Sequence, residues 1–297
     1  KIENQNEVQT PQISLHDWGE PTLHKKLPNF IKYAKGKNFI VGFSSNFNTS
    51  PDWEEIIKAK PDFIKVSISS LKKDNYKLTH RGGNLSRLLK NLNEVIKLRE
   101  RYSPLTDIQM NYHIYAHNLN EEYEKVREFS KKNNLSWHGE IAIFMPIEKI
   151  VNFRQSVDTG DLKINNDDEK IISSLLISPL SQYNYWKENK KIREKFKDCS
   201  RQINKMAIRV DGSVPVCCGV YGEEFTVAKN FLEEDISDIQ KKRENFKYCG
   251  VCKSTGAHAS YAVGRRSIII NRLIQKRNFF GKIARKLRYR PIKFNKI

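Results

Sequence analysis

The first half of the chain alternates short apolar runs with stretches whose apolar residues recur every three or four positions. Apolar runs rich in β-branched and aromatic residues predict strands, and the wider spacing predicts amphipathic helices. The predicted elements are strand 12–16, helix 27–36, strand 38–45, helix 52–60, strand 63–70, helix 84–102, strand 107–117, helix 121–133 and strand 135–145. This strict alternation predicts a parallel α/β sheet or barrel with its chemistry at the carboxyl ends of the strands.

Residues 146–198 give no clear pattern of strands or helices. The acidic, turn-rich segments 158–161 and 165–169 fit a solvated loop better than a calcium site, because their spacing differs from that of an EF-hand. The aromatic side chains of Tyr183, Tyr185 and Trp186 are more typical of a core than of a pocket. This range is expected to link a first domain to a second.

Beyond residue 198 the cysteines lie at a spacing typical of a thiolate metal site. Cys199 and Cys217 are separated by seventeen residues, and Cys249 and Cys252 form a Cys-x2-Cys pair. Four thiolates are the ligand set of soft tetrahedral metals. Cys218 is the cysteine left over, because neighbouring residues of an extended segment point to opposite faces.

The segment between Cys199 and Cys217 predicts a β-hairpin. Residues 206–210 alternate as a strand does, Asp211-Gly212 is a turn sequence, and a second short strand ends at Cys217. The hairpin would therefore present a thiol at its end.

Spacing alone leaves zinc and iron–sulfur as alternatives. A zinc ribbon usually takes its ligands from two Cys-x2-Cys pairs, and this chain has one. A disulfide framework is disfavoured because five cysteines in 297 residues are sparse and odd in number, and the first residues show no secretory apolar run. These features favour a reducing, cytoplasmic compartment.

Two sets of motifs resemble those of one enzyme family. Cys-x12-Gly-x4-Cys followed by Cys-x2-Cys resembles the auxiliary iron–sulfur domain, called SPASM or in its shorter form twitch, of many radical S-adenosylmethionine (radical SAM) enzymes. Gly19-Glu20-Pro21 follows the first predicted strand; alone it is a strand stop, but in this position it resembles the family's Gly-Glu-Pro motif. Weaker similarities stand at the next strand ends, at Ser44-Ser45-Asn46, Ser67-Ile68-Ser69 and Asn118.

The resemblance implies a fold and a domain order. It implies a partial (β/α)6 radical SAM barrel that lacks its first β/α unit, followed by a small α+β auxiliary-cluster domain and a basic helical tail. The corresponding ranges are barrel 1–145, linker 146–198, SPASM/twitch domain 199–256 and tail 257–297.

The resemblance also implies cofactors, ligands and partners. S-adenosylmethionine would be bound by residues at the strand ends, namely Gly19, Glu20, Pro21, Asn46 and Ser67. One auxiliary [4Fe–4S] cluster would be held by Cys199, Cys217, Cys249 and Cys252. The implied reaction is hydrogen abstraction from an unactivated carbon of a peptide, carbohydrate or other natural product, with a flavodoxin- or ferredoxin-like reductase as electron donor.

The chain departs from the family pattern in two places. The Cys-x3-Cys-x2-Cys loop that holds the family's SAM-reducing cluster is absent, since the first cysteine is Cys199. We therefore expect a chain that lacks its N-terminal β/α unit, is inactive by itself, and gains a second cluster in the intact protein. The alternative is a natural non-catalytic scaffold that binds iron–sulfur or zinc. In the longer SPASM pattern a further cysteine would stand where this chain has His258, so one auxiliary cluster is expected.

Positive charge is concentrated at the C-terminal end. The chain has a net charge of +19, and residues 264–297 contain twelve Lys or Arg and no acid. Their apolar residues recur at helical spacing, which predicts a basic amphipathic helix that either lies on an anionic membrane or packs on the barrel. No recognised nucleic-acid motif accompanies the charge, so no specific nucleic-acid partner is expected. No apolar stretch is long enough to span a bilayer.

Overall fold

The computed structural model of the protein describes residues 11–119, 121–160, 165–177 and 179–260. The chain divides into two compact units, residues 1–140 and 141–297, each of which is described by itself. Of the predicted basic tail, residues 257–297, the part from residue 261 onward lies outside the described residues. Among the helices of the described part, none is long and apolar enough to cross a membrane.

The first unit is built on a five-stranded sheet with the order β1-β2-β3-β4-β5. β1 pairs with β2, β2 with β3 and β3 with β4, all in parallel. Neighbouring strands in the sheet are also consecutive in the chain, as expected where helices connect parallel strands. The strands are β1 (Gln12–Ser14), β2 (Ile40–Ser45), β3 (Phe63–Ile68), β4 (Asp107–Ile114) and β5 (Ser136–Ile141).

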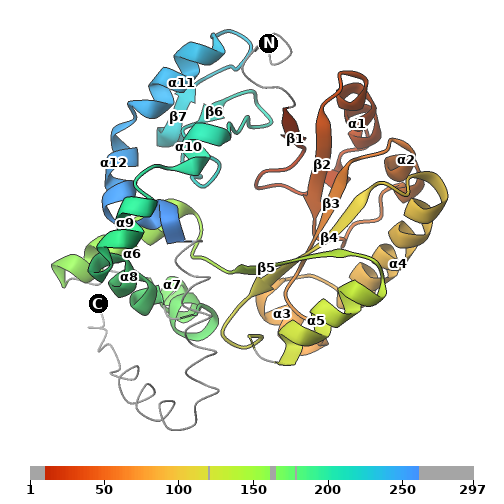
Figure 1. Ribbon diagram of the computed structural model, residues 1–297, viewed down its shortest axis with the longest axis horizontal. Coiled ribbons are helices and arrows are strands. Elements are labelled where there is room, and N and C mark those ends of the chain that lie inside the picture. The colour runs from red at the N-terminus through yellow and green to blue at the C-terminus, as the bar shows by residue number, and fades with distance from the viewer. Residues whose placement is uncertain (1–10, 120, 161–164, 178, 261–297) are drawn as a thin grey trace. The chain divides into compact units, whose positions relative to one another are not determined.

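Helices of the first unit lie on one side of this sheet (Figure 1). The 18-residue helix α4 shows how nearby residues in the sequence specify a helix. Asn84 caps its N-terminus by accepting a hydrogen bond from the Arg87 amide. Leu88, Leu92 and Val95 form its buried stripe. The helical elements are η2 (Pro21–Leu23), α1 (Leu27–Gly36), α2 (Trp53–Lys58), α3 (Lys73–Thr79), α4 (Leu85–Tyr102) and α5 (Glu121–Lys132).

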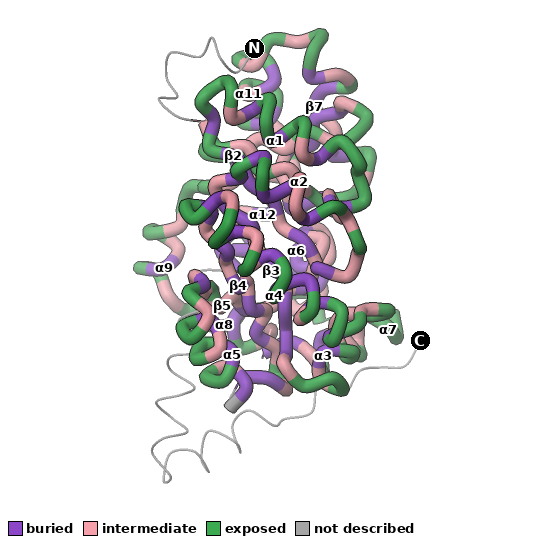
Figure 2. The backbone as a smooth tube through the Cα atoms, turned by 90° about the vertical axis from the view of Figure 1, so that its right-hand side faces the viewer, coloured by how far each residue is buried: buried purple, intermediate pink, exposed green. Residues whose placement is uncertain are grey.

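The two faces of the sheet differ in polarity. Along β4 every second residue is buried, and one of these, Tyr112, packs edge-on against Tyr123 of α5. The residues between them, such as Asn111 and His113, are half-buried and polar. In Figure 2 strands β3 and β4 are accordingly purple and pink, whereas green residues follow the helices. The face away from the helices is therefore the one that presents polar groups.

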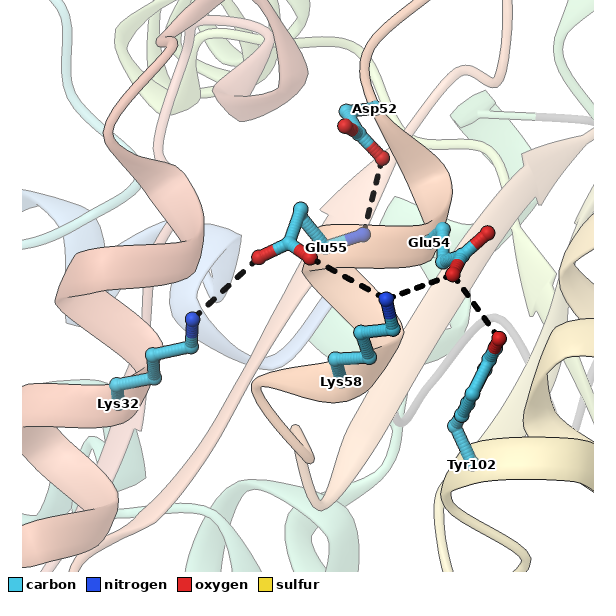
Figure 3. A network of polar contacts seen from close by, with 6 residues as sticks. All are labelled: Lys32, Asp52, Glu54, Glu55, Lys58 and Tyr102. Carbon is cyan, nitrogen blue, oxygen red and sulfur yellow. Dashed lines mark hydrogen bonds and ion pairs between the residues drawn. The ribbon is translucent and has the colours of Figure 1, made fainter.

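A network of charged side chains links three helices of the first unit (Figure 3). Lys58 of α2 lies 2.7 Å from Glu54 and 3.5 Å from Glu55. Glu55 also pairs with Lys32 of α1, and Glu54 accepts a hydrogen bond from the Tyr102 hydroxyl of α4. These groups are exposed, so the network orients α2 more than it stabilises the fold.

The second unit is mainly helical. Its small sheet pairs β6 and β7 in antiparallel fashion. Tyr183 and Trp186 are buried in a core with Ile192 and Ala259, as their aromatic character predicts. The elements are α6 (Ile147–Thr159), α7 (Asn166–Lys170), η3 (Ile171–Leu175), α8 (Pro179–Glu188), α9 (Lys190–Lys195), α10 (Ser200–Asn204), β6 (Val214–Pro215), η4 (Glu223–Phe225), β7 (Thr226–Ala228), α11 (Ile236–Glu244), α12 (Lys247–Ser254) and η5 (Ala257–Ala259).

The predicted hairpin before Cys217 is wrong in its pairing. The turn is present, with Gly212 at a φ of +85° and the Arg209 amide donating to the Ser213 carbonyl at 2.8 Å. Residues 206–210, however, form no strand, and β6 pairs with β7 instead. Side-chain hydrogen bonds explain this choice, because the Arg209 guanidinium donates to Thr226 at the start of β7 and so ties the turn to that strand.

Several helices were not anticipated from the sequence. The range 146–198 contains α6 to α9, and α3 follows β3. α3 buries one side chain, Tyr76, which leaves no apolar period to read.

Candidate cofactor and metal sites

Glu20 joins the segment after β1 to the end of β2. One carboxylate oxygen accepts a hydrogen bond from the Asn46 amide at 2.8 Å, and the other accepts from the Thr22 amide at 3.1 Å and the Thr22 hydroxyl at 2.5 Å. The carboxylate therefore holds two loops of the chain together. Gly19 beside it is exposed, and a side chain there would meet no atom within 4 Å, so open space adjoins Gly19.

Ser67 and Asn46 lie at the carboxyl ends of adjacent strands. The Ser67 hydroxyl is 3.2 Å from that of Ser44, and the Ser44 amide donates to Nδ1 of His16 at 3.1 Å. The predicted cofactor residues Glu20, Asn46 and Ser67 thus belong to one polar edge of the sheet, as the ends of parallel strands require. Pro21 begins the short helix η2 and positions Glu20 as its cap.

Two asparagines that the sequence analysis did not single out hold the loop after β2. Asn91 is 6% exposed, and its amide donates to the Phe47 and Thr49 carbonyls at 2.9 and 2.8 Å. Asn48 donates to the Tyr76 hydroxyl and accepts from the Asn84 amide. Asn91 could have been recognised from the sequence, because it lies on the apolar stripe of α4 and a buried polar side chain there needs a specific hydrogen-bond partner.

Asn118 has a structural role in the described residues. Its side-chain amide donates to the Ser69 and His113 carbonyls, and its side-chain oxygen accepts from the Tyr115 amide. The side chain is buried, and these bonds tie the ends of β3 and β4 together.

Two half-buried histidines lie near the same ends of β3 and β4. Burial, with a smaller contribution from nearby His113, lowers the pKa of His80 to about 4. The His80 ring stacks on Tyr76 at a centroid distance of 4.3 Å, and its Nδ1 is 3.0 Å from the Ser69 hydroxyl. Burial also lowers the pKa of His113, opposed by Glu140. Both imidazoles are therefore neutral at pH 7.

In the second unit, the four predicted ligands line one cavity of about 30 Å³, and Cys218 is not among its lining residues. Cys199 occupies the residue before the first turn of α10, and Cys217 follows β6. Cys249 and Cys252 lie on α12, where residues three apart share a face. The remaining lining residues are Ile147, Arg201, Gln202, Val216, Val220, Tyr248, Lys253 and His258.

The thiols of this cavity hold their protons strongly. Burial raises the pKa of Cys217 to about 11. Burial, together with the neighbouring cysteines, raises the pKa of Cys252 to about 12, and burial also raises the pKa of Cys249. A metal that binds here must displace these protons, so its affinity rises with pH.

The thiols surround a space and do not converge on one point. Within the described residues, no three His, Cys, Asp or Glu side chains are grouped closely enough to hold a single metal ion. Tetrahedral zinc, with Zn–S bonds of about 2.3 Å, would draw four sulfur atoms to within about 4 Å of one another. An iron–sulfur cubane binds each thiolate at a different iron, so it suits four thiols spread around a cavity.

No protein-family model matches the chain, and no curated protein sequence matches it. Similar solved structures were found. Native anSMEcpe with bound AdoMet has a TM-score of 0.50 and 12% identity, covering 81% of this chain and 70% of that one. SuiB of Streptococcus suis bound to S-adenosylmethionine has a TM-score of 0.50 and 13% identity, covering 79% of this chain and 55% of that one. SuiB bound to its precursor peptide SuiA has a TM-score of 0.51 and 13% identity, covering 79% and 54%.

These neighbours are radical SAM enzymes, and the likeness at this level of identity establishes the fold. The chain has an α/β fold with a five-stranded sheet that is consistent with a partial radical SAM barrel. It spans a little over half the length of SuiB.

Proposed function

We propose that this chain is part of a radical SAM enzyme that binds S-adenosylmethionine in its first unit and one auxiliary [4Fe–4S] cluster in its second. The observation that carries the proposal is the gathering of four cysteines around one cavity in a chain with this fold. When bound and reduced, S-adenosylmethionine supplies radical chemistry that removes hydrogen from an unactivated carbon.

The polar edge of the sheet supports the cofactor site. Glu20 fixes the Asn46 backbone and so shapes the ends of β1 and β2, while the open space at Gly19 leaves room for a ligand beside it. Ser67 adds a hydroxyl one strand further along. In this proposal Gly19, Glu20, Pro21, Asn46 and Ser67 bind and orient the cofactor, and the apolar face of the sheet carries the fold.

The donor set of the second unit supports a cluster. The cavity offers four thiols and no carboxylate among its lining residues, which fits a soft metal centre. The Gly219 amide donates to Sγ of Cys217 at 3.3 Å, the type of contact that stabilises a cluster thiolate. Tyr248 and the apolar residues of the wall would keep water from the sulfur atoms.

Substrate and partners are proposed from chemistry and from one neighbour. SuiB is recorded with its precursor peptide, which favours a peptide as the substrate class of the intact protein. A flavodoxin- or ferredoxin-like reductase would deliver electrons, and the basic residues 264–297 would attract an anionic surface such as a membrane. The compartment consistent with this chemistry is the cytoplasm.

Anaerobic reconstitution tests the cluster. The protein is expected to bind about one [4Fe–4S] cluster per chain, measured as iron, acid-labile sulfide and charge-transfer absorption. Alanine at Cys199, Cys217, Cys249 or Cys252 is expected to abolish binding, and Cys218→Ala serves as the matched control that retains it. One zinc per chain that iron does not replace would contradict the proposal and favour the non-catalytic zinc scaffold.

A further inference from the structure

Two arginines of the second unit are buried without an acid. Arg154 is 3% exposed and Arg243 is 1% exposed. A buried guanidinium is costly unless an anion or a full set of hydrogen bonds compensates it. Among the described residues, neither guanidinium forms an ion pair with a carboxylate, and their hydrogen-bond acceptors are neutral.

Arg243 contacts the segments that carry three of the thiols. Its Nε donates to the Val216 carbonyl at 3.0 Å, directly before Cys217, and its Nη2 donates to the Arg201 carbonyl at 3.2 Å, close after Cys199. The carbonyl of Arg243 itself lies 3.9 Å from Sγ of Cys249. One side chain of α11 therefore stands behind the wall of the cysteine cavity.

Arg154 stands on the side of the fourth thiol. Its two Nη atoms donate to the Thr255 carbonyl at 2.8 Å and to the Ser260 hydroxyl at 2.9 Å, both on the segment that follows Cys252. Its guanidinium lies 5.2 Å from the centre of the Tyr183 ring.

Cysteines of the cavity act on the pKa of both arginines. Burial lowers the pKa of both arginines; Cys217, Cys249, Cys218 and Cys199 oppose this at Arg243, and Tyr183 followed by Cys252 opposes it at Arg154. Arg201 and Lys253 add positive charge at the cavity wall, and no acid lines it. With protonated thiols, the wall of the cavity is therefore positive, while Glu148 and Glu224 are near enough to Tyr248 of this wall to act on its pKa.

We propose that Arg154 and Arg243 are the counter-charges of a dianionic tetrathiolate centre in this cavity. The inference rests on the proposed cluster and goes beyond it. An oxidised [4Fe–4S] cluster with four thiolates carries two negative charges, which two guanidiniums balance. Because reduction adds a negative charge, the arginines favour the reduced cluster and raise its midpoint potential.

Charge-matched variants of the full-length chain distinguish a counter-charge from an arginine that only joins segments of the chain by hydrogen bonds. Arg243→Lys and Arg243→Gln both lose the guanidinium hydrogen bonds, but only the Gln variant loses the charge; Arg154→Lys and Arg154→Gln form the same pair. The midpoint potential of the reconstituted protein is measured by a redox titration followed by electron paramagnetic resonance. Each Gln variant is expected to shift to a more negative potential, by about tenfold in the reduction equilibrium constant or about 59 mV for one electron.

The Lys variants are expected to stay near wild type, as is Lys190→Gln, which removes a charge from an exposed side chain of α9. Equal potentials in the Lys and Gln variants would overturn the inference and leave the arginines as cross-links. If one Gln variant does not fold, the Lys and Gln pair at the other arginine carries the test, and Lys253→Gln at the cavity wall serves as a reference for the effect of removing one charge.

Metal binding by the wild-type protein tests the proposed function, and the variants test the role of the arginines. If it binds cobalt or zinc at the four cysteines but no cluster, the proposed function fails. The inference is then tested by cobalt affinity, which should fall about tenfold in the Gln variants and hold in the Lys variants. A wild-type protein that binds no metal at all would overturn both.

Discussion

Asn91 is a polar residue on the apolar stripe of α4, and its side chain decides the shape of the loop after β2. Phe47 in this loop has a φ of +55°, a conformation that non-glycine residues adopt only when their surroundings hold them. The Asn91 amide bonds the carbonyls on either side of the loop, those of Phe47 and Thr49. A single buried amide thus helps to position Asn46, a proposed cofactor residue.

Replacing Asn91 with alanine is expected to lower the free energy of unfolding by about 1–3 kcal/mol, because two buried carbonyls lose their donor. Urea denaturation measures the change, and Lys90→Ala on the exposed side of the same helix is the control, with an expected change within about 0.5 kcal/mol. Equal effects at the two positions would show that the amide does not hold the loop.

His80 makes stability depend on pH. Its pKa is about 4 in the folded protein and about 6.5 in the unfolded chain, so between these values the unfolded chain binds more protons. The contribution of His80 to the free energy of unfolding is expected to be fully present above pH 6.5 and to be lost as the pH falls toward 4. His80 contributes up to about 3 kcal/mol to this loss.

Denaturation curves of the wild type and of His80→Gln at pH 7, 6, 5 and 4 isolate that contribution from the carboxylates that titrate in the same range. The variant is expected to show a shallower decline, because His113, whose pKa is also lowered, retains part of it. Parallel declines in the two proteins would mean that His80 is not the group responsible.

At the scale of elements, α2 is short enough that its N-terminal cap matters. Asp52 precedes this six-residue helix and accepts a hydrogen bond from the Glu55 amide at 3.0 Å, and two acids follow in the first turn. The charged network of Figure 3 surrounds the same helix in solvent.

Asp52→Ala is expected to cost about 1 kcal/mol, because the first turn of α2 loses its cap. Lys58→Ala, which breaks two exposed ion pairs of the network, is expected to cost less, and high salt should shrink its effect further. Thermal melts at low and high salt compare the two. A larger loss for Lys58→Ala would show that the network, and not the cap, supports the helix.

The boundaries of several elements agree with those predicted from the spacing of apolar residues in the sequence. Helix α1 occupies 27–36, as its apolar spacing predicts, and β3 and β4 begin at Phe63 and Asp107, where the predicted strands begin. The helices of 146–198 could not be read in this way. α8 buries Gln182, Tyr183 and Trp186, and a single pair of aromatic residues three apart beside a buried amide is too short a pattern to predict a helix.

At the scale of the whole molecule, the fold resembles that of radical SAM enzymes, while these 297 residues contain no Cys-x3-Cys-x2-Cys. The full chain with a reconstituted auxiliary cluster is therefore expected to form no 5′-deoxyadenosine from S-adenosylmethionine in the presence of dithionite. Chromatography of the reaction mixture measures the product. Turnover would show that the auxiliary cluster itself reduces the cofactor and would overturn this account of the chain.

The sequence by itself determined the alternation of strands and helices in the first unit and the set of cysteines. These follow from hydrophobic period and from spacing, which are properties of residues near one another in the chain. Only the tertiary structure decided how Glu20 is used and that Arg154 and Arg243 bond to the segments that carry the thiols. Such juxtapositions join segments 26 to more than 100 residues apart, as in the Glu20–Asn46 and Arg154–Ser260 hydrogen bonds, and no local pattern encodes them.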